Sequence, residues 1–564
     1  MFAKEYCLEL IKRNIEITID GPKDVYYFVP NKTFWSEWSA HKEELKEQGY
    51  RVSKLNGKWI VAYYTDAELK PNLKLYEGEI VVPDGLKLRP YQEHGVRLIL
   101  GSERLLLGDD LGLGKTIQAI TAINTLDCDD VIIVAPAFVS DKWYAELKRW
   151  LYRPRDIYVN EKEYSGNGVY IYSYEHAVKL SPFSGKIWDY CIFDEAHYLK
   201  NSKAQRTQSL IGRKGECIEA KRYLFMTGTP ALNRPSELWP LVKFIDPEGI
   251  GKNWYSFHLR YCNAKQNKYG WDVSGACNLE ELNSLLCSRI MVRRRKGDVA
   301  SDIPQKERVL VTFPVESPTI ASILQEEKEI INKIRSYVGM GAIRHNKSVV
   351  EASYYMRGFS KINKQIAVAS IPTYGAHINK ILSTTNDQIV IFGRHIDFVQ
   401  MMGRYLNLPE NNIVHGALRV DQRSKIAESF RNGDIRVLVA TIASLGVGVD
   451  LITYDRNVRV IFCEYPWQPG LLEQAEDRVC RIGQKGNVIV EYLLIEKSFF
   501  HRVFNFILNK NKTTSVISDG QQKDFKLKQK SYNLDCFIDL IKECDKFGSD
   551  ELNNIQSNTE SLLI

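Results

Sequence analysis

Two series of short apolar segments, each alternating with helical patterns, constrain the fold more than any other feature of this sequence. The first series is RLLLGDD, DVIIVAP, VYIYSYE, YCIFDEA and RYLFMTG. The second is QIVIFGRHIDFVQMMGRYL, RVLVATIAS, VRVIFCEYP and VIVEYLLIE. Continuous apolar strands between helices are typical of a parallel sheet that is covered on both faces. The sequence therefore predicts an α/β protein with two doubly wound parallel-sheet lobes.

The pattern along the chain predicts five segments. They are a small module of strands and one helix (1–85), a first lobe (86–250), a helical insertion and linker (251–375), a second lobe (376–515) and a C-terminal extension with a polar tail (516–564). The helix of the first module is expected near WSEWSAHKEELKEQGY. The insertion contains the amphipathic stretch IASILQEEKEIINKIRSY, which predicts a long helix.

Composition limits the class of protein and its surroundings. A chain of 564 residues is too long for a single core. No apolar run reaches the roughly 18 residues that span a bilayer, and the N-terminal stretch MFAKEYCLELIKRN does not resemble a signal peptide. Eleven cysteines with no C-x-x-C pair indicate reduced thiols and no structural zinc. We expect an intracellular protein, and its net charge of +7 permits a polyanionic partner.

The stretch LLLGDDLGLGKTIQAI predicts a strand, a glycine-rich turn and a helix start. Backbone N–H groups of such a turn can surround phosphates, and Gly112 and Gly114 remove side chains that would block them. Lys115 can reach the terminal phosphates and the Thr116 hydroxyl can bind Mg²⁺. Asp109 stands where the strict pattern has glycine, so a chance glycine-rich turn is the alternative.

A pair of carboxylates ends a later strand in YCIFDEAHYLKN. In this class of sheet, such a position lies beside the phosphate loop. Asp194 is the candidate Mg²⁺ ligand, and Glu195 is the candidate base that polarises the attacking water. The alternative is a surface acidic pair that caps the next helix.

Two further motifs flank these elements. Gln92, in LRPYQEHGV, carries an amide that can read the edge of adenine. In FMTGTPALN, Thr227 and Thr229 flank Gly228 at a strand end, where hydroxyls could link the nucleotide site to a second ligand. A simple turn before a helix explains that motif equally well.

The stretch QAEDRVCRIGQ places Gln474, Arg478 and Arg481 on one face of a predicted helix, with Pro469 before it and Gly483 at its end. An arginine from a second lobe can stabilise charge as a γ-phosphate departs. The alternative is a solvated face in which Arg478 pairs with Glu473 or Asp477.

The ordered motifs PYQEHGV, LGDDLGLGKT, DEAH, TGTPALNRPSELW, ATIASLGVGVD and QAEDRVCRIGQ resemble the SWI/SNF-like DNA translocases of helicase superfamily two, over residues 86–520. The segments LRYCNAKQNKYGWDVSGACNLEEL, MVRRRKGDVASDIPQKERV and EYPWQPGLLEQAEDRVCRIGQ are similar to the annealing-helicase (HARP-like) branch. The resemblance implies two RecA-like lobes that close on ATP. The nucleotide-binding residues that it implies are Gln92, Asp110, Gly112, Leu113, Gly114, Lys115, Thr116 and Gln474.

The resemblance also implies movement along double-stranded or forked DNA with little strand separation, and roles in strand annealing and DNA repair. Phosphate contacts without base readout suffice for such a track. Candidate coupling or DNA-contacting residues are Thr227, Gly228, Thr229, Lys142, Trp143, Gly446 and Gly448, together with the basic run 293–296. Trp143 could instead belong to the core, and the basic run could be a solvated element.

The sequence therefore predicts a monomeric ATP- and Mg²⁺-dependent DNA translocase, with Glu195 as base and with Lys115, Arg478 and Arg481 stabilising the transition state. It is expected in the cytoplasm of a bacterial or phage-infected host, or in a eukaryotic nucleus. Three alternatives stay open at this point: a strand-separating helicase on DNA or RNA, a non-hydrolysing DNA clamp, and a nucleosome remodeller.

Overall fold

The computed structural model describes the strands at 25–28, 50–55 and 58–64, residue 39, and residues 71–501. Within the last range it leaves out residues 162, 180–185, 213–216, 229, 231–233, 268–269, 274, 301, 305, 340–345, 446–449 and 466–468. Apart from Leu111–Leu113, which group with the second unit, the described chain divides between Arg294 and Arg295 into two compact units, and each is considered by itself.

The first unit is built on a sheet of seven parallel strands. Across the sheet these are β12 (Met291–Val292), β4 (Arg104–Leu107), β9 (Glu219–Met226), β8 (Ile187–Asp194), β5 (Asp130–Ala135), β7 (Gly168–Ser173) and β6 (Ile157–Val159). The five strands expected in this lobe are all present, and the prediction of a parallel sheet is confirmed.

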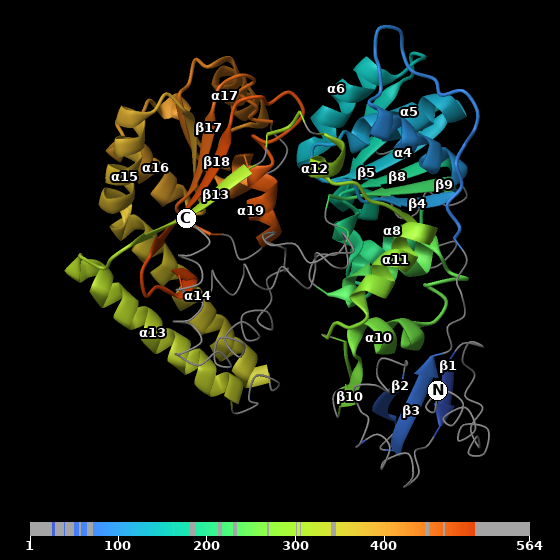
Figure 1. The fold of residues 1–564 in the computed structure, drawn as a ribbon, viewed down its shortest axis with the longest axis horizontal. Coiled ribbons are helices and arrows are strands. Elements are labelled where there is room, and N and C mark those ends of the chain that lie inside the picture. The colour runs from blue at the N-terminus through green and yellow to red at the C-terminus, as the bar shows by residue number, and fades with distance from the viewer. Residues whose placement is uncertain are drawn as a thin grey trace. The chain divides into compact units, whose positions relative to one another are not determined.

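Alternate residues of each central strand enter different cores, so both faces of the sheet are buried. On β5, Val131 and Ile133 pack in one apolar cluster, whereas Ile132 and Val134 pack in the other. Figure 1 shows helices on both faces of this sheet. The helices of the first cluster are α4 (Pro90–Gly101), α5 (Lys115–Leu126) and α6 (Ser140–Trp150). Those of the second include α7 (Tyr174–Lys179), α8 (Gln205–Ile211), α9 (Trp239–Ile245), α10 (Trp254–Cys262) and α11 (Leu279–Arg289).

The second unit has a sheet of six parallel strands. Their order is β13 (Lys306–Phe313), β18 (Val488–Ile495), β17 (Val458–Phe462), β14 (Gln388–Gly393), β16 (Val437–Thr441) and β15 (Ile413–Val414). The helices α15 (Ile371–Thr384) and α16 (Ile396–Tyr405) pack with one face in a shared apolar cluster. The remaining helices of this unit are α12 (Lys296–Val299), α13 (Pro318–Gly339), α14 (Asn346–Ala369), α17 (Val420–Asn432), α18 (Ile442–Leu445) and α19 (Pro469–Glu476).

The segment 251–375, predicted as one insertion, contributes to both units. Its helices α10 and α11 belong to the core of the first unit, and β12 extends that unit's sheet beside β4. By contrast, β13 pairs with β18 at the edge of the second sheet. The long amphipathic helix predicted within this segment is confirmed as α13.

At the N-terminus, β1 (Val25–Phe28), β3 (Lys58–Tyr64) and β2 (Tyr50–Leu55) form a small antiparallel sheet in that order. The predicted strands of the first module are therefore confirmed. Most of its predicted helix and the whole segment 516–564 lie outside the described residues. Across the part of the chain that the structure describes, no helix combines the length and apolar character needed to span a membrane.

Candidate active site

The glycine-rich turn follows β4 and leads into α5, as the sequence predicts. Gly114 is the N-cap of α5 and has a φ of +78°, and Gly112 has a φ of +84°. Residues with side chains rarely adopt these angles, so both positions favour glycine. A Cβ atom on Gly114 would lie 2.4 Å from Nε2 of Gln92. Gln92 is buried in α4, so its amide is placed directly against the turn.

Lys115 begins α5, and its ammonium group folds back over the turn. Its Nζ donates to the backbone carbonyls of Asp109, at 2.7 Å, and of Asp110, at 3.2 Å. Burial lowers the pKa of Lys115, and the carboxylates of Glu195, Asp109 and Asp194 oppose that shift. The lysine therefore belongs to the same electrostatic cluster as both carboxylates of the DEAH motif.

Asp109, which departs from the strict glycine pattern, anchors the turn. Its buried carboxylate accepts from Nε2 of Gln118 at 3.0 Å and from the Arg294 guanidinium, with Nε at 2.9 Å and Nη2 at 2.5 Å. The neighbouring Asp110 pairs with Arg293 at 2.6 Å. A carboxylate at position 109 is thus satisfied by a guanidinium 185 positions later in the chain.

The basic run 293–296, considered as a DNA contact, is engaged within the protein. Arg293 and Arg294 bind the two aspartates of the turn, and their side chains are 5% and 11% exposed. Arg295 pairs with Asp298, and Lys296 pairs with Asp477. The prediction of a DNA-contacting run is wrong for the first two residues, because the buried carboxylates of the turn require counter-ions.

Asp194 ends β8, and its side chain is held by two donors. Trp143 donates its indole N–H to Oδ2 at 2.8 Å, and the backbone N–H of Glu195 donates to Oδ1 at 3.0 Å. Burial and the adjacent Glu195 carboxylate raise the pKa of Asp194 to about 6, although Trp143 and Lys115 act in the opposite direction. Trp143 itself is 1% exposed, so its ring is a core element and is not available to stack on a base.

Glu195 adopts a left-handed backbone conformation, with φ of 50° and ψ of 51°. This is unusual for a residue with a side chain, and such strain gathers at functional sites. His197 Nδ1 lies 3.1 Å from a carboxylate oxygen of Glu195 and 3.3 Å from the hydroxyl of Thr227. A buried histidine therefore joins the acidic pair to the strand end that carries the predicted threonine motif.

The remaining predicted residues of the first unit fall around this cluster or outside the described residues. Thr227 is fully buried, and the carbonyl of Gly228 accepts from Arg293 at 3.1 Å. Thr116 lies in the first turn of α5, Leu113 is buried in the turn, and Lys142 is half-buried on α6. Thr229 lies outside the described residues.

In the second unit, α19 ends at Glu476, so the prediction that one helix carries Arg478 and Arg481 is wrong. After Glu476 the chain forms a turn, in which the N–H of Arg478 bonds to the carbonyl of Ala475, only three positions back, at 3.2 Å. The carbonyl of Arg478 accepts from the N–H of Leu451 at 2.9 Å, a contact that leaves the helical path. Gln474 remains within α19 and is buried.

The two arginines share Asp450 as an ion-pair partner. The Asp450 carboxylate contacts Nη1 of Arg481, and it lies 3.8 Å from Nη1 of Arg478. Asp477, which the sequence offered as a partner of Arg478, instead pairs with Lys296 and with Lys306, each at 2.6 Å. The side chain of Glu473, together with Gly446 and Gly448, lies outside the described residues.

A buried charge network fixes the chain just before the arginines. Glu476 pairs with Arg308 at 2.6 Å and with Lys306 at 3.0 Å, and its carboxylate also accepts from the Tyr492 hydroxyl. Burial alone would raise the pKa of Glu476, but Arg308 and Lys306 hold it at about 2. The edge strand β13 therefore positions the segment that carries Arg478 and Arg481.

Gln484, at the end of RIGQ, fixes the other side of that segment. Its fully buried amide accepts from the N–H of Thr453 at 2.7 Å and donates to the carbonyls of Arg456 and Gly486, at 2.9 and 3.1 Å. Local sequence does not reveal this role, because Thr453 and Arg456 lie about 30 positions earlier.

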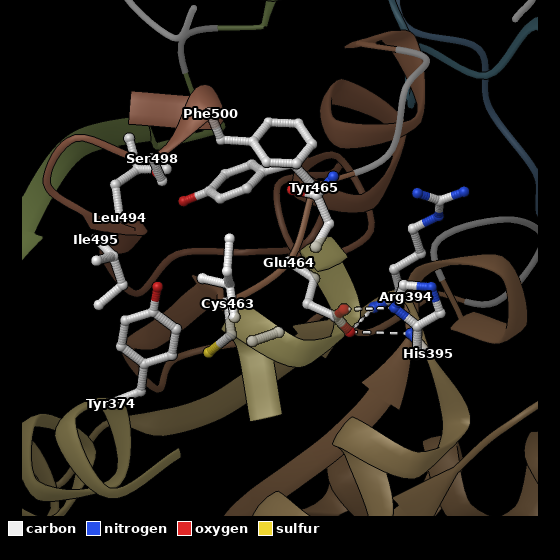
Figure 2. Close-up of a pocket in the computed structure, with 13 residues that line it drawn as sticks. Tyr374, Arg394, His395, Cys463, Glu464, Tyr465, Leu494, Ile495, Ser498 and Phe500 are labelled. Carbon is white, nitrogen blue, oxygen red and sulfur yellow. Dashed lines mark hydrogen bonds and ion pairs between the residues drawn. The ribbon is translucent and has the colours of Figure 1, made fainter. Parts of the chain in front are cut away.

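A separate hollow opens at the carboxyl ends of β14, β17 and β18 (Figure 2). Glu464 lies at its side, where its carboxylate accepts from the backbone N–H groups of Arg394 and His395, at 2.7 and 2.9 Å, and contacts His395 Nδ1 at 2.6 Å. Tyr374, Cys463 and Tyr465 contribute to its walls. No motif in the sequence points to these residues as a site.

Comparison with known families accounts for both units. Residues 91–320 match the model of the SNF2-related domain, and residues 374–483 match the helicase conserved C-terminal domain. The chain is an SNF2-related protein with a helicase C-terminal domain. The turn, the acidic pair and the cluster around them lie in the SNF2-related domain, and the arginine segment lies in the helicase C-terminal domain.

Relatives of this SNF2-related protein fall in the branch that its motifs resemble. It is 31% identical, over 75% of its length and 61% of the relative's, to the Caenorhabditis elegans homolog of SWI/SNF-related matrix-associated actin-dependent regulator of chromatin subfamily A-like protein 1. It is 29% identical, over 78% of its length and 42% of the relative's, to the mouse DNA annealing helicase and endonuclease ZRANB3. The chain thus spans between about two fifths and three fifths of these relatives.

Among solved structures, the SNF2-related chain is similar to the Sulfolobus solfataricus SWI2/SNF2 ATPase core in complex with double-stranded DNA. The identity is 22% and the TM-score is 0.37, with 79% of this chain and 95% of that chain covered.

Proposed function

We propose that this protein is an ATP-dependent translocase on double-stranded or branched DNA, which remodels forks or anneals strands with little unwinding. The observation that carries the proposal is the half-buried cluster of Lys115, at the start of α5, with Asp194 and Glu195, at the end of β8, beside a turn whose conformation favours glycine. The relatives named as annealing helicase and as regulators of chromatin support the same assignment.

The residues of the first unit fit a nucleotide carrying Mg²⁺. The turn ends at the N-terminus of α5, where backbone N–H groups and the helix dipole favour a phosphate. Lys115 donates to carbonyls of the turn, and these neutral acceptors can be exchanged for phosphate oxygens. Thr116 and Asp194 would hold the Mg²⁺, which when bound neutralises charge on the phosphates.

Glu195 would orient and deprotonate the attacking water, with His197 holding its carboxylate toward the Thr227 strand end. Lys115, Arg478 and Arg481 would stabilise the charge that develops on the phosphate. Gln92, whose amide lies beside Gly114, would bind the adenine base. Lys142, Gly228, Gly446 and Gly448 would contact DNA or couple its binding to hydrolysis.

The test is steady-state ATPase activity with single-stranded DNA, duplex, forked DNA and RNA, with annealing and unwinding measured in parallel. Duplex or forked DNA should stimulate hydrolysis, and tailed duplexes should stay largely paired. Lys115→Ala should give no ATP turnover above background, and circular dichroism should show that this variant is still folded.

Three results would favour other functions. Efficient unwinding of a tailed duplex would indicate a strand-separating helicase, and background hydrolysis with every ligand would indicate a clamp. Stimulation by nucleosomes far above that by naked DNA would indicate a remodeller. Because the proposed substrate is DNA, we propose that the protein acts in the cytoplasm of a bacterial host or in the nucleus of a eukaryotic one.

A further inference from the structure

Asp450 forms ion pairs with Arg478 and Arg481, the two arginines that the proposed mechanism needs. Its carboxylate is in ion-pair contact with Arg481 and lies 3.8 Å from Arg478. The Arg478 and Arg481 side chains are 8% and 13% exposed, and Asp450 is 30% exposed. A nearly buried guanidinium is costly unless its charge is compensated, and the Asp450 carboxylate supplies compensating charge to both arginines.

The segment that carries Asp450 and the segment that carries the arginines form one frame. The N–H of Leu451 donates to the carbonyl of Arg478 at 2.9 Å, and the N–H of Lys485 donates to the carbonyl of Tyr454 at 2.8 Å. Gln484 links to Thr453 from both ends of its amide. Backbone and buried side-chain bonds therefore hold Asp450 opposite the arginines, which distinguishes the contact from a mobile surface pair.

An N–H group that binds a carboxylate cannot bind a phosphate oxygen at the same time. The backbone frame and the charges indicate one role for Asp450, and this role rests on the proposed function. We propose that Asp450 is an internal anion that holds Arg478 and Arg481 in the resting state and is exchanged for phosphate oxygens when the nucleotide is engaged. Asp450 thereby restrains hydrolysis in the absence of DNA and is a positioning residue.

The first test compares ATPase rates of Asp450→Asn with the wild type, with and without duplex DNA. Asparagine keeps the shape of the side chain and removes its charge. We expect the DNA-free kcat to rise by about fivefold or more, and the DNA-saturated kcat to stay within about twofold, so that the stimulation ratio falls. Asp450→Glu should restore the low DNA-free rate.

The matched control is Asp455→Asn, on the same segment. Asp455 pairs with Lys485 at 3.1 Å, and both side chains are 75% exposed. This variant should leave both rates unchanged. Equal loss of the DNA-free and DNA-saturated rates in Asp450→Asn, or no change in either, would overturn the proposal.

The second test needs no hydrolysis and therefore separates this proposal from the proposed function. In a Lys115→Ala background, which weakens the phosphate turn, inorganic pyrophosphate is titrated by calorimetry. Asp450→Asn should bind it more tightly by about fivefold or more, and adding Arg481→Ala should reverse that gain. Identical affinities with and without Asp450→Asn would overturn the proposal, even for a protein that proves to be no ATPase.

Discussion

The indole N–H of Trp143 donates to Oδ2 of Asp194 at 2.8 Å, so a core tryptophan on α6 supports the carboxylate that we propose binds Mg²⁺. Trp143→Phe removes this hydrogen bond. A hydrogen bond to a charged group contributes about 1.5–3 kcal/mol, so the pKa of Asp194 should rise by about 1 unit or more. We expect ATPase activity at pH 6.5 to require several-fold more Mg²⁺, measured by titration of the metal.

Trp150→Phe is the matched control, because Trp150 is buried on the same helix and in the same apolar cluster. Both variants should lose stability through poorer packing. Only Trp143→Phe should change the Mg²⁺ requirement, and an equal change in Trp150→Phe would mean that packing alone is responsible.

The raised pKa of Asp194 predicts a pH dependence of stability. Burial and the neighbouring Glu195 raise this pKa from 3.8 to about 6, so the native state holds a proton that the unfolded state has released between these values. The contribution of the Asp194 carboxyl to the free energy of unfolding is therefore fully present below pH 3.8 and is lost as pH rises through about 6. Asp194→Asn should remove this dependence of the free energy of unfolding on pH.

The measurement is the free energy of unfolding from urea titrations of nucleotide-free protein between pH 4.5 and 7.5. The difference between wild type and Asp194→Asn isolates this carboxyl from all others. The wild type should lose stability relative to the variant as the pH rises, and a constant difference would contradict the raised pKa.

Arg481→Ala tests the arginine assignment. Loss of an arginine that stabilises the transition state should lower turnover by about 10³-fold or more, while ATP binding by the first unit should persist. Fluorescent-nucleotide binding and single-turnover hydrolysis measure the two effects. Lys485→Ala, at a position with a 75% exposed side chain, is the control and should behave as wild type. Normal turnover with tight ATP binding in Arg481→Ala would refute the assignment.

The sequence predicts the framework well because the signal for a central parallel strand is local. Strands such as β5 and β14 are apolar at successive positions, and both faces are buried in the structure. The edge strand β13 escaped prediction because none of its residues is fully buried: most are half-buried and two are exposed, as expected for a strand with one neighbour.

The parts of the site that depend on distant contacts were not predictable. Beyond the end of α19, the carbonyl of Arg478 accepts from the N–H of Leu451, and the stretch QAEDRVCRIGQ alone gives no sign of that contact. Asp109 departs from the strict glycine pattern, and its structural role could not be predicted because its partner Arg294 is 185 positions away. The alternative reading of the sequence paired Arg478 with Glu473 or Asp477, but its ion-pair partner is Asp450, in the segment between α18 and β17.

Glu476→Gln tests whether β13 holds the arginine segment in place. The carboxylate is buried between Lys306 and Arg308, and removing one partner of such a pair costs about 3 kcal/mol or more, because the remaining charges stay buried. Arg308 and Lys306 hold the pKa of Glu476 at about 2, below its ordinary 4.5, so the stabilisation is present above pH 4.5 and is lost as pH falls toward 2. The loss of stability in Glu476→Gln should therefore be full at pH 7 and should shrink below pH 4.5. Calorimetric unfolding at several pH values measures it, with the exposed Glu410→Gln as control. A loss that is independent of pH, or one matched by Glu410→Gln, would mean that the ion pairs of β13 do not fix this segment.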